Sequence, residues 1–188
     1  MEAFLVSVGV VALAEIGDKT QLLVLVLSAR DRRSLPIVLG ILVGTLANHT
    51  LAALFGAWLV ETLGEGTMRW IVAAAFLAMA AWTLVPDKLG EQTASASRFG
   101  VFGTTVSAIF LLEMADKTQI ATVTLAARYA SVLPVIAGTT VGMLLANVPA
   151  VYLGERVLKY VPLTVMRRIA AGTFALLGVL AIAGHAAG

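Results

Sequence analysis

Two short and nearly identical groups of charged and polar residues stand out in an otherwise apolar sequence. The first is Glu15-Ile-Gly-Asp-Lys-Thr-Gln21, and the second is Glu113-Met-Ala-Asp-Lys-Thr-Gln119. Each contains two carboxylates three residues apart, followed by a lysine, a threonine and a glutamine. Carboxylate, carbonyl and amide oxygens are the ligands that hard divalent cations such as Mg²⁺, Ca²⁺ and Mn²⁺ prefer. These two groups, called here the first and second acidic boxes, are therefore the candidate site of the protein's chemistry.

The four carboxylates are the expected main ligands, and the glutamines are expected to add amide oxygens. Residues three apart share one face of a helix, so the two carboxylates of each box should point the same way. Thr20 and Thr118 could add hydroxyl oxygens, although a threonine within a helix more often bonds to its own backbone. The predicted metal ligands are Glu15, Asp18, Glu113, Asp116, Gln21 and Gln119.

Lys19 and Lys117 each follow the glutamate of their box by four residues, the favourable order for an ion pair within one helix. They either neutralise a carboxylate when no cation is bound, which we favour, or face a vestibule and shape access. Four carboxylates and two ammonium groups sum to −2, which suits one divalent cation or two protons. Crowded carboxylates in a low-dielectric site oppose full ionisation, so proton uptake on cation release is physically reasonable. The structural alternative is a pair of salt bridges that only hold helices together.

The composition places these boxes in a membrane protein. Of the 188 residues, 60% are hydrophobic and 13% are charged, with a mean hydropathy of +0.95. Soluble domains carry about 25% charged residues, so an ordinary soluble enzyme, a disordered chain and a coiled coil are excluded. The absence of cysteine excludes disulfide scaffolds and thiol catalysts. A net charge of +2 gives no argument for a nucleic-acid partner.

Six apolar stretches are candidates to cross a bilayer, which takes about 20 residues. Glu15 lies about 18 Å into the first stretch, at a rise of 1.5 Å per residue, and so lies near the bilayer midplane. Glu113 and Asp116 lie at a similar depth in the fourth. Ionisable groups at that depth are costly, and are functional candidates for that reason. The stretches are Ala3–Ala29, Leu35–Val60, Trp70–Val85, Phe99–Ala127, Leu133–Leu153 and Val165–Ala187.

The sequence repeats itself at an offset of 98 positions without a gap. Besides the boxes, this offset aligns Leu35-Pro36 with Leu133-Pro134, Gly40 and Gly44 with Gly138 and Gly142, Gly56 with Gly154, and Arg69 with Arg167. A repeat with an odd number of spans enters the membrane in the opposite orientation. The expected fold is therefore an all-α integral membrane protein of six transmembrane helices, arranged as two inverted three-helix repeats, 1–86 and 99–188, joined by a linker at 87–98. Inverted repeats recur in transporters, with the site at the midplane between them.

The basic residues predict an orientation in the membrane. One face receives nine Lys and Arg residues, whereas the other receives only Arg69 and Arg128. The positive-inside rule then places both termini outside the cytoplasm.

Three further polar residues lie in the second and fifth stretches. Asn48, His49 and Asn147 either form hydrogen bonds between helices or support the site, for example by handling protons. His49 aligns with Asn147 in the repeat.

The Glu-φ-Gly-Asp-Lys-Thr boxes resemble the signature of the Gdt family, formerly catalogued as uncharacterised protein family sixteen. The resemblance covers essentially the whole chain, and Ala115 of the second box is its one departure. It implies a secondary transporter of a bacterial inner membrane that exports a divalent cation in exchange for protons, Mn²⁺ first and Ca²⁺ second. The implied cation ligands are Glu15, Asp18, Glu113 and Asp116, supported by Lys19, Thr20, Lys117 and Thr118.

These expectations make the protein a transporter rather than an enzyme. No cofactor is expected, because Mn²⁺ or Ca²⁺ is the transported substrate and H⁺ the counter-ion. Membrane lipid is the expected surrounding, and a homodimer is left open. The main alternative is a divalent-cation channel or uniporter without proton coupling. For an intramembrane hydrolase, the sequence offers no convincing nucleophile and no pair of metal-binding histidines. A scaffold or a small-molecule exporter would keep its function when the box carboxylates are replaced.

Overall fold

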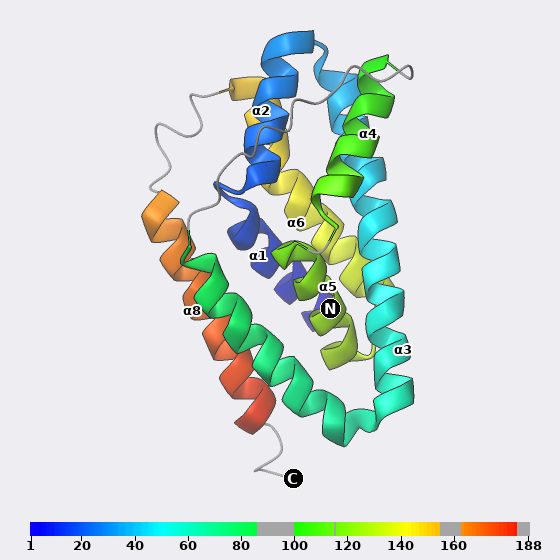
Figure 1. The fold of residues 1–188 in the computed structure, drawn as a ribbon, viewed down its shortest axis with the longest axis vertical. Helices are drawn as coiled ribbons and strands as arrows, with labels where there is room; N and C mark the ends of the chain where they lie inside the picture. The colour runs from blue at the N-terminus through cyan, green and yellow to red at the C-terminus, as the bar shows by residue number, and fades with distance from the viewer. Residues whose placement is uncertain (86–99, 115, 155–162, 184–188) are drawn as a thin grey trace.

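The protein is all-helical in the parts that the computed structural model describes, residues 1–85, 100–114, 116–154 and 163–183. The all-α prediction is confirmed for these residues. The predicted linker, 87–98, lies outside them. The helices are α1 (Glu2–Glu15), α2 (Lys19–Asp31), α3 (Ser34–Thr83), α4 (Gly100–Leu112), α5 (Lys117–Tyr129), α6 (Val132–Leu153) and α8 (Leu163–Ala183), as drawn in Figure 1.

Three of the described helices, α3, α6 and α8, are long and apolar enough to cross a membrane, and α4 is a shorter apolar helix. The 50 residues of α3 form two arms, because Gly64 has a non-helical backbone with φ of +75°. Glycine adopts this conformation without a Cβ clash. Figure 1 shows the chain turning back at this bend, at the opposite end of the bundle from the α2–α3 connection. The predicted second and third stretches fall on the two arms, while the count of six spans stays a prediction.

Each box interrupts its helix, which corrects the prediction of one continuous helix through each box. In the first box α1 ends at Glu15 and α2 begins at Lys19. Gly17 has a φ of +78°, and Asp18 is the N-cap of α2, its carboxylate accepting a hydrogen bond from the Thr20 N–H at 3.4 Å. An aspartate N-cap satisfies a backbone donor at a helix start.

The second box is broken in the same way. There α4 ends at Leu112, and Asp116 is the N-cap of α5. The two carboxylates of a box therefore lie on opposite sides of a helix break rather than on one helical face.

Glycine pairs on α6 and α3 let these helices pack closely against α1 and α4, the helices that precede the two breaks. A Cβ built on Gly138 of α6 would lie 2.5 Å from the Phe4 carbonyl oxygen of α1, and one built on Gly40 of α3 would lie 2.5 Å from Cβ of Thr105 in α4. Gly142 and Gly44 meet α1 and α4 one turn further on. Small residues are typical of tightly packed helices in membranes. Thus α1 and α4 each pack against a helix from the other half of the sequence.

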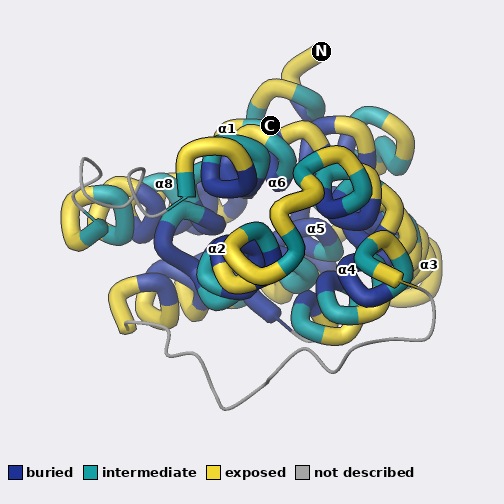
Figure 2. Tube along the Cα trace, turned by 90° about the horizontal axis from the view of Figure 1, so that it is seen from above, coloured by how far each residue is buried: buried dark blue, intermediate teal, exposed yellow. Residues whose placement is uncertain are grey.

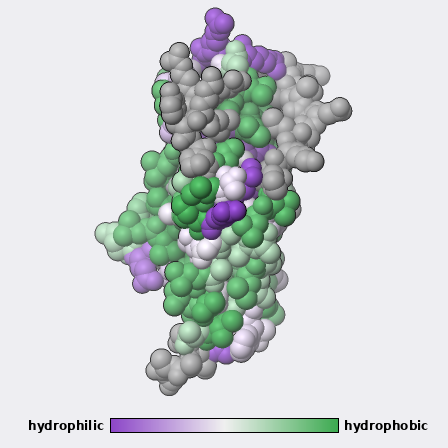
Figure 3. All heavy atoms as spheres, turned by 90° about the vertical axis from the view of Figure 1, so that its left-hand side faces the viewer, coloured by the Kyte–Doolittle hydropathy of each residue, from purple (hydrophilic) through white to green (hydrophobic). Residues whose placement is uncertain are grey.

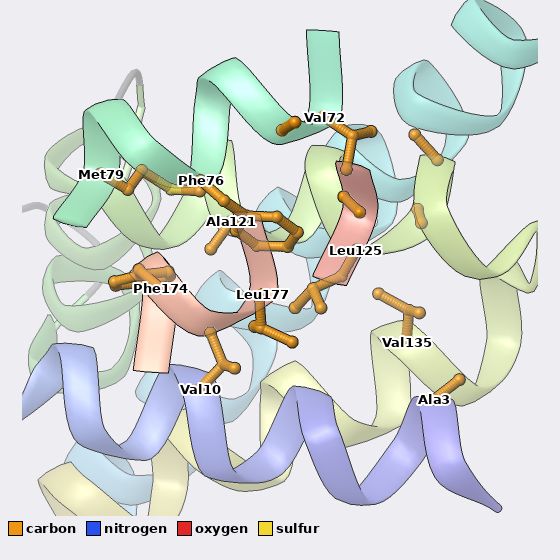
Figure 4. Close-up of a cluster of buried hydrophobic side chains, with 14 of the residues drawn as sticks. Ala3, Val10, Val72, Phe76, Met79, Ala121, Leu125, Val135, Phe174 and Leu177 are labelled. Carbon is orange, nitrogen blue, oxygen red and sulfur yellow. The ribbon is translucent and has the colours of Figure 1, made fainter. Parts of the chain in front are cut away.

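An apolar core fills the space between α1, α5, α8 and the second arm of α3 (Figure 4). Within it the rings of Phe76 and Phe174 contact each other, with their centroids 6.3 Å apart. Figure 2 shows buried residues on the facing sides of the helices and exposed residues on their outer sides. The outer face in Figure 3 is mostly apolar where it is coloured, with small hydrophilic groups. An apolar outside suits contact with lipid.

Candidate cation site

The two helix breaks meet in the interior, so the boxes form one site. Lys19 of the first box pairs with Asp116 of the second, Nζ to Oδ1, at 2.8 Å. Lys117 of the second box pairs with Asp18 of the first at 2.5 Å. All four box carboxylates are buried, with at most 1% of each residue exposed. Residues almost a hundred positions apart are thereby joined by reciprocal ion pairs.

These ion pairs correct the predicted pairing of each lysine with the glutamate of its own helix. Because the helix is interrupted between the glutamate and the lysine of each box, their four-residue spacing no longer brings them together. Each lysine instead crosses to the aspartate of the other box. The favoured idea that the lysines neutralise carboxylates agrees with this arrangement, but the partners are different. The two pairs also differ in exposure, since the Lys19 side chain is 26% exposed and the Lys117 side chain 4%.

Glu113 is held by hydroxyl groups from both boxes. Its Oε1 accepts a hydrogen bond from Thr20 and its Oε2 accepts one from Thr118. Both threonines are fully buried. Each threonine lies in the first turn of its helix, where no helical carbonyl lies four residues earlier, so its hydroxyl is available to Glu113. Both carboxylate oxygens of Glu113 are therefore satisfied.

Glu15, the counterpart of Glu113, has a different environment. Its Oε1 accepts a hydrogen bond from the Asn147 side-chain amide of α6 at 3.1 Å, and the same amide group donates to the Met143 carbonyl. Glu15 Oε2 and Asn147 Oδ1 have no hydrogen-bond partner among the described residues, although both atoms are buried. Buried acceptors without partners are rare in folded proteins and call for an explanation. Here two such oxygens belong to side chains in direct contact.

The two glutamines also differ. Gln21 braces the first break, since its Oε1 accepts from the Gly17 N–H at 2.9 Å and its Nε2 donates to the Ala146 carbonyl of α6 at 2.8 Å. Gln119 is partly exposed, and its amide nitrogen lies 3.8 Å from the sulfur of Met114. Gln21 thus links the first box to α6.

Asn48 and His49 lie on α3, fully buried. The Asn48 amide donates to the Phe110 carbonyl of α4 at 3.3 Å, so this residue links two helices. Neither ring nitrogen of His49 has a hydrogen-bond partner in the described parts of the chain. Within those parts, the structure brings neither residue into a hydrogen bond with a box carboxylate.

The box carboxylates are not grouped as a finished metal site. Among the residues described, no group of three or more His, Asp or Glu side chains is arranged to hold a metal ion. Asp18, Asp116 and Glu113 each have a lysine or threonine partner, although Asp116 Oδ2 accepts no hydrogen bond from the described residues. Glu15 and Asn147, whose side chains are in contact, each offer one further unpartnered oxygen. Cation binding by all four carboxylates would need the two ammonium groups to move away.

Comparisons with known proteins identify the family of the chain. The sequence profile described as divalent cation/proton antiporter GDT1 matches residues 3–91 and 101–188. A protein of Vibrio cholerae serotype O1 named "Putative manganese exporter" is 46% identical over 180 residues, which cover 95% of this chain and 90% of that protein. No solved structure matches the chain. The resemblance seen in the boxes is thereby confirmed: the chain belongs to the GDT1 family of divalent cation/proton antiporters, and is a membrane transport protein rather than an enzyme.

Proposed function

We propose that this protein exports Mn²⁺ across a bacterial inner membrane in exchange for protons, with Ca²⁺ as the second substrate. The observation that carries the proposal is the reciprocal pairing of the two buried boxes. Each lysine forms an ion pair with the aspartate of the other box. The family supports cation exchange, and the similarity to a named manganese exporter favours Mn²⁺.

Glu15 and Asn147 are the proposed first contacts of the cation. Glu15 Oε2 and Asn147 Oδ1 are a carboxylate and an amide oxygen, both buried and both without partners among the described residues. Oxygen ligands of these two types suit Mn²⁺ and Ca²⁺ alike. As the cation enters, its charge displaces Lys19 and Lys117, which frees Asp18 and Asp116 to become ligands.

Exchange follows from competition for the same oxygens. A divalent cation neutralises the carboxylates from one side of the membrane, and protons neutralise them from the other. Because uncompensated charge inside a membrane protein is costly, the site favours the cation-bound and the protonated forms over the empty, ionised form. Coupling therefore needs no separate proton pathway in this proposal.

The unequal packing of the two halves supports access from one end at a time. At Gly56 of α3 a Cβ would meet the Val123 carbonyl of α5 and lie 3.2 Å from the Ala126 side chain. At Gly154, the counterpart of Gly56 in the repeat, a Cβ would meet nothing within 4 Å in the described structure. The tight packing at Gly56 and the greater exposure of Lys19 favour a state in which the cation site is closed on the α5 side and accessible on the α2 side. The α2 end carries Arg30–Arg33 and is the end expected to face the cytoplasm.

The test is Mn²⁺ and Ca²⁺ flux into proteoliposomes with and without an imposed pH gradient. Glu15→Gln is compared with Glu61→Gln, which changes an exposed carboxylate outside the boxes. We expect saturable flux driven by the pH gradient, lost in Glu15→Gln and kept in Glu61→Gln. Flux that ignores the gradient would indicate a channel or uniporter. If the folded protein transports neither ion, the boxes have a purely structural role.

A further inference from the structure

A second polar feature lies away from the boxes, at the end of the bundle where α3 bends. A cavity of about 600 Å³ opens between the second arm of α3, the last turn of α5 and the end of α8. Its size is in the range of small-molecule sites. The box residues of α5 are at the opposite end of that helix, so the proposed cation site does not use this cavity.

Two arginines line this cavity from different helices. Arg69 comes from the second arm of α3 and Arg128 from the last turn of α5. The Nε atom of each is buried and has no hydrogen-bond partner among the described residues. A buried donor left unsatisfied costs about 1–3 kcal/mol, and more when it is charged. Two guanidinium groups from different helices line one cavity, each with an Nε–H that no described residue accepts, and their charge points to an anionic ligand.

The carboxylates around the cavity do not neutralise the two arginines. Glu65 is the acidic residue among those lining it, and it is exposed at the bend. Glu2 lies nearby, where its carboxylate accepts a hydrogen bond from the Tyr129 hydroxyl at 3.2 Å. None of the ion pairs found between described residues joins Arg69 or Arg128 to a carboxylate. The two guanidinium groups therefore outnumber the one lining carboxylate.

The aromatic neighbours place these arginines at the level of the lipid headgroups. The Arg69 guanidinium lies 4.9 Å from the centre of the Trp70 ring, and that of Arg128 lies 5.6 Å from the Tyr129 ring. Trp70 is 56% exposed. Exposed Trp and Tyr side chains are typical of the membrane–water interface.

The rest of the lining explains which anion would fit. Apolar side chains, including Met68, Val72 and Leu180, line the cavity beside the arginines. A free inorganic anion would gain nothing from such a wall, whereas a phospholipid presents a phosphate next to its glycerol and acyl carbons. Arginine suits phosphate because its planar group donates two parallel hydrogen bonds.

We propose that this cavity binds the phosphate of a membrane phospholipid through Arg69 and Arg128. One phosphate held by both residues ties the second arm of α3 to α5. These two arginines are also the only basic residues that the sequence assigns to this face of the membrane, where basic residues are otherwise avoided. The site gives them a role that orientation alone does not.

The test is native mass spectrometry of the full-length protein titrated with phosphatidylglycerol. The variant Arg69→Gln/Arg128→Gln is compared with Arg32→Gln/Arg33→Gln, which removes two exposed arginines at the other end. We expect wild type and control to bind alike and the cavity variant to bind about tenfold more weakly or worse, the loss that one or two charged hydrogen bonds would give. Equal binding by the cavity variant would overturn the proposal.

Three further measurements complete the test: one uses a variant that keeps both charges, and two use other ligands. Arg69→Lys/Arg128→Lys keeps both charges, and we expect it to fold and to bind at an intermediate level; wild-type binding by this variant would overturn bidentate recognition. Diacylglycerol, which lacks the phosphate, should not be retained, and retention equal to phosphatidylglycerol would mean apolar packing alone. If inorganic phosphate raised the melting temperature as much as the lipid does, the lipid assignment would be overturned. None of these readouts depends on cation transport.

Discussion

The ion pair between Lys117 and Asp18 should be one of the strongest polar contacts in the protein. Its atoms are 2.5 Å apart, and the side chains are 4% and 0% exposed. Removing one partner of a buried pair leaves an uncompensated charge and costs about 3–5 kcal/mol. We therefore expect Lys117→Met to lower the free energy of unfolding by that amount. Asp18→Asn should do the same, because asparagine preserves the cap of α2 and only the charge is lost.

The double variant Lys117→Met/Asp18→Asn removes both charges at once, so it should be more stable than the sum of the single losses predicts. The expected coupling energy is about 2–3 kcal/mol, the upper part of the range for residues in contact. The equivalent cycle at Lys19 and Asp116 should give less, because solvent screens a lysine that is 26% exposed.

The assay is equilibrium unfolding in mixed micelles of rising SDS content, followed by tryptophan fluorescence. The decisive comparison is a second cycle that joins Lys117→Met to Glu113→Gln. Pairing within one box, as the spacing alone suggests, predicts strong coupling to Glu113, whereas the structure predicts strong coupling to Asp18. Coupling to Asp18 below about 0.5 kcal/mol, the scatter expected for independent sites, would refute the crossed pairing.

Three further predictions concern the helix contacts and the site. Gly138→Ala should destabilise the protein by about 1–3 kcal/mol in the same assay, because its Cβ would lie 2.5 Å from the Phe4 carbonyl. The control Gly9→Ala should lose no stability, because a Cβ there meets nothing within 4 Å. Equal losses in the two variants would contradict the close packing at Gly138. Thr20→Val and Thr118→Val should each slow cation exchange in proteoliposomes by removing a donor to Glu113. Thr173→Val, which changes a half-buried residue bonded to its own helix, should not. Asn147→Ala should raise the KM for Mn²⁺ about tenfold, the effect of losing one oxygen ligand or charged hydrogen bond, and an unchanged KM would exclude Asn147 from the site.

The sequence predicted the composition of the site better than its geometry. Burial of the four carboxylates and the close approach at Gly40 and Gly138 followed from apolar surroundings and small residues. The helix breaks did not, since a helix surrounded by apolar groups has no polar face whose periodicity could reveal an interruption. In the first box Gly17 followed by Asp18 is the signal that could have shown it, because this pair is typical of a turn leading into a capped helix. Ala115 removes that signal from the second box.

Local spacing in the sequence could not predict the crossed ion pairs or the different environments of the two glutamates. Lys19 and Asp116 are brought together only by the packing of two halves of the chain. The boxes have nearly the same sequence, so a sequence argument gives Glu15 and Glu113 the same surroundings. In the structure Glu113 has two hydroxyl donors and Glu15 has an amide and an unpartnered oxygen. Two nearly identical motifs occupy different environments because each glutamate meets a different part of the fold, Glu15 the Asn147 amide of α6 and Glu113 the threonines of both boxes.

The distribution of charge in the site leads to a prediction about stoichiometry. Four carboxylates and two ammonium groups carry −2, and the reciprocal pairs assign both ammonium charges to Asp18 and Asp116. The remaining charge falls on Glu15 and Glu113, which together match one divalent cation or two protons. Exchange of one Mn²⁺ for two protons would then move no net charge. In proteoliposomes with a fixed pH gradient, a potassium diffusion potential of either sign set by valinomycin should leave the rate of Mn²⁺ flux unchanged. A rate that rises with one sign of the potential and falls with the other would mean that a different number of protons is carried, and that the lysines or aspartates change charge during the cycle.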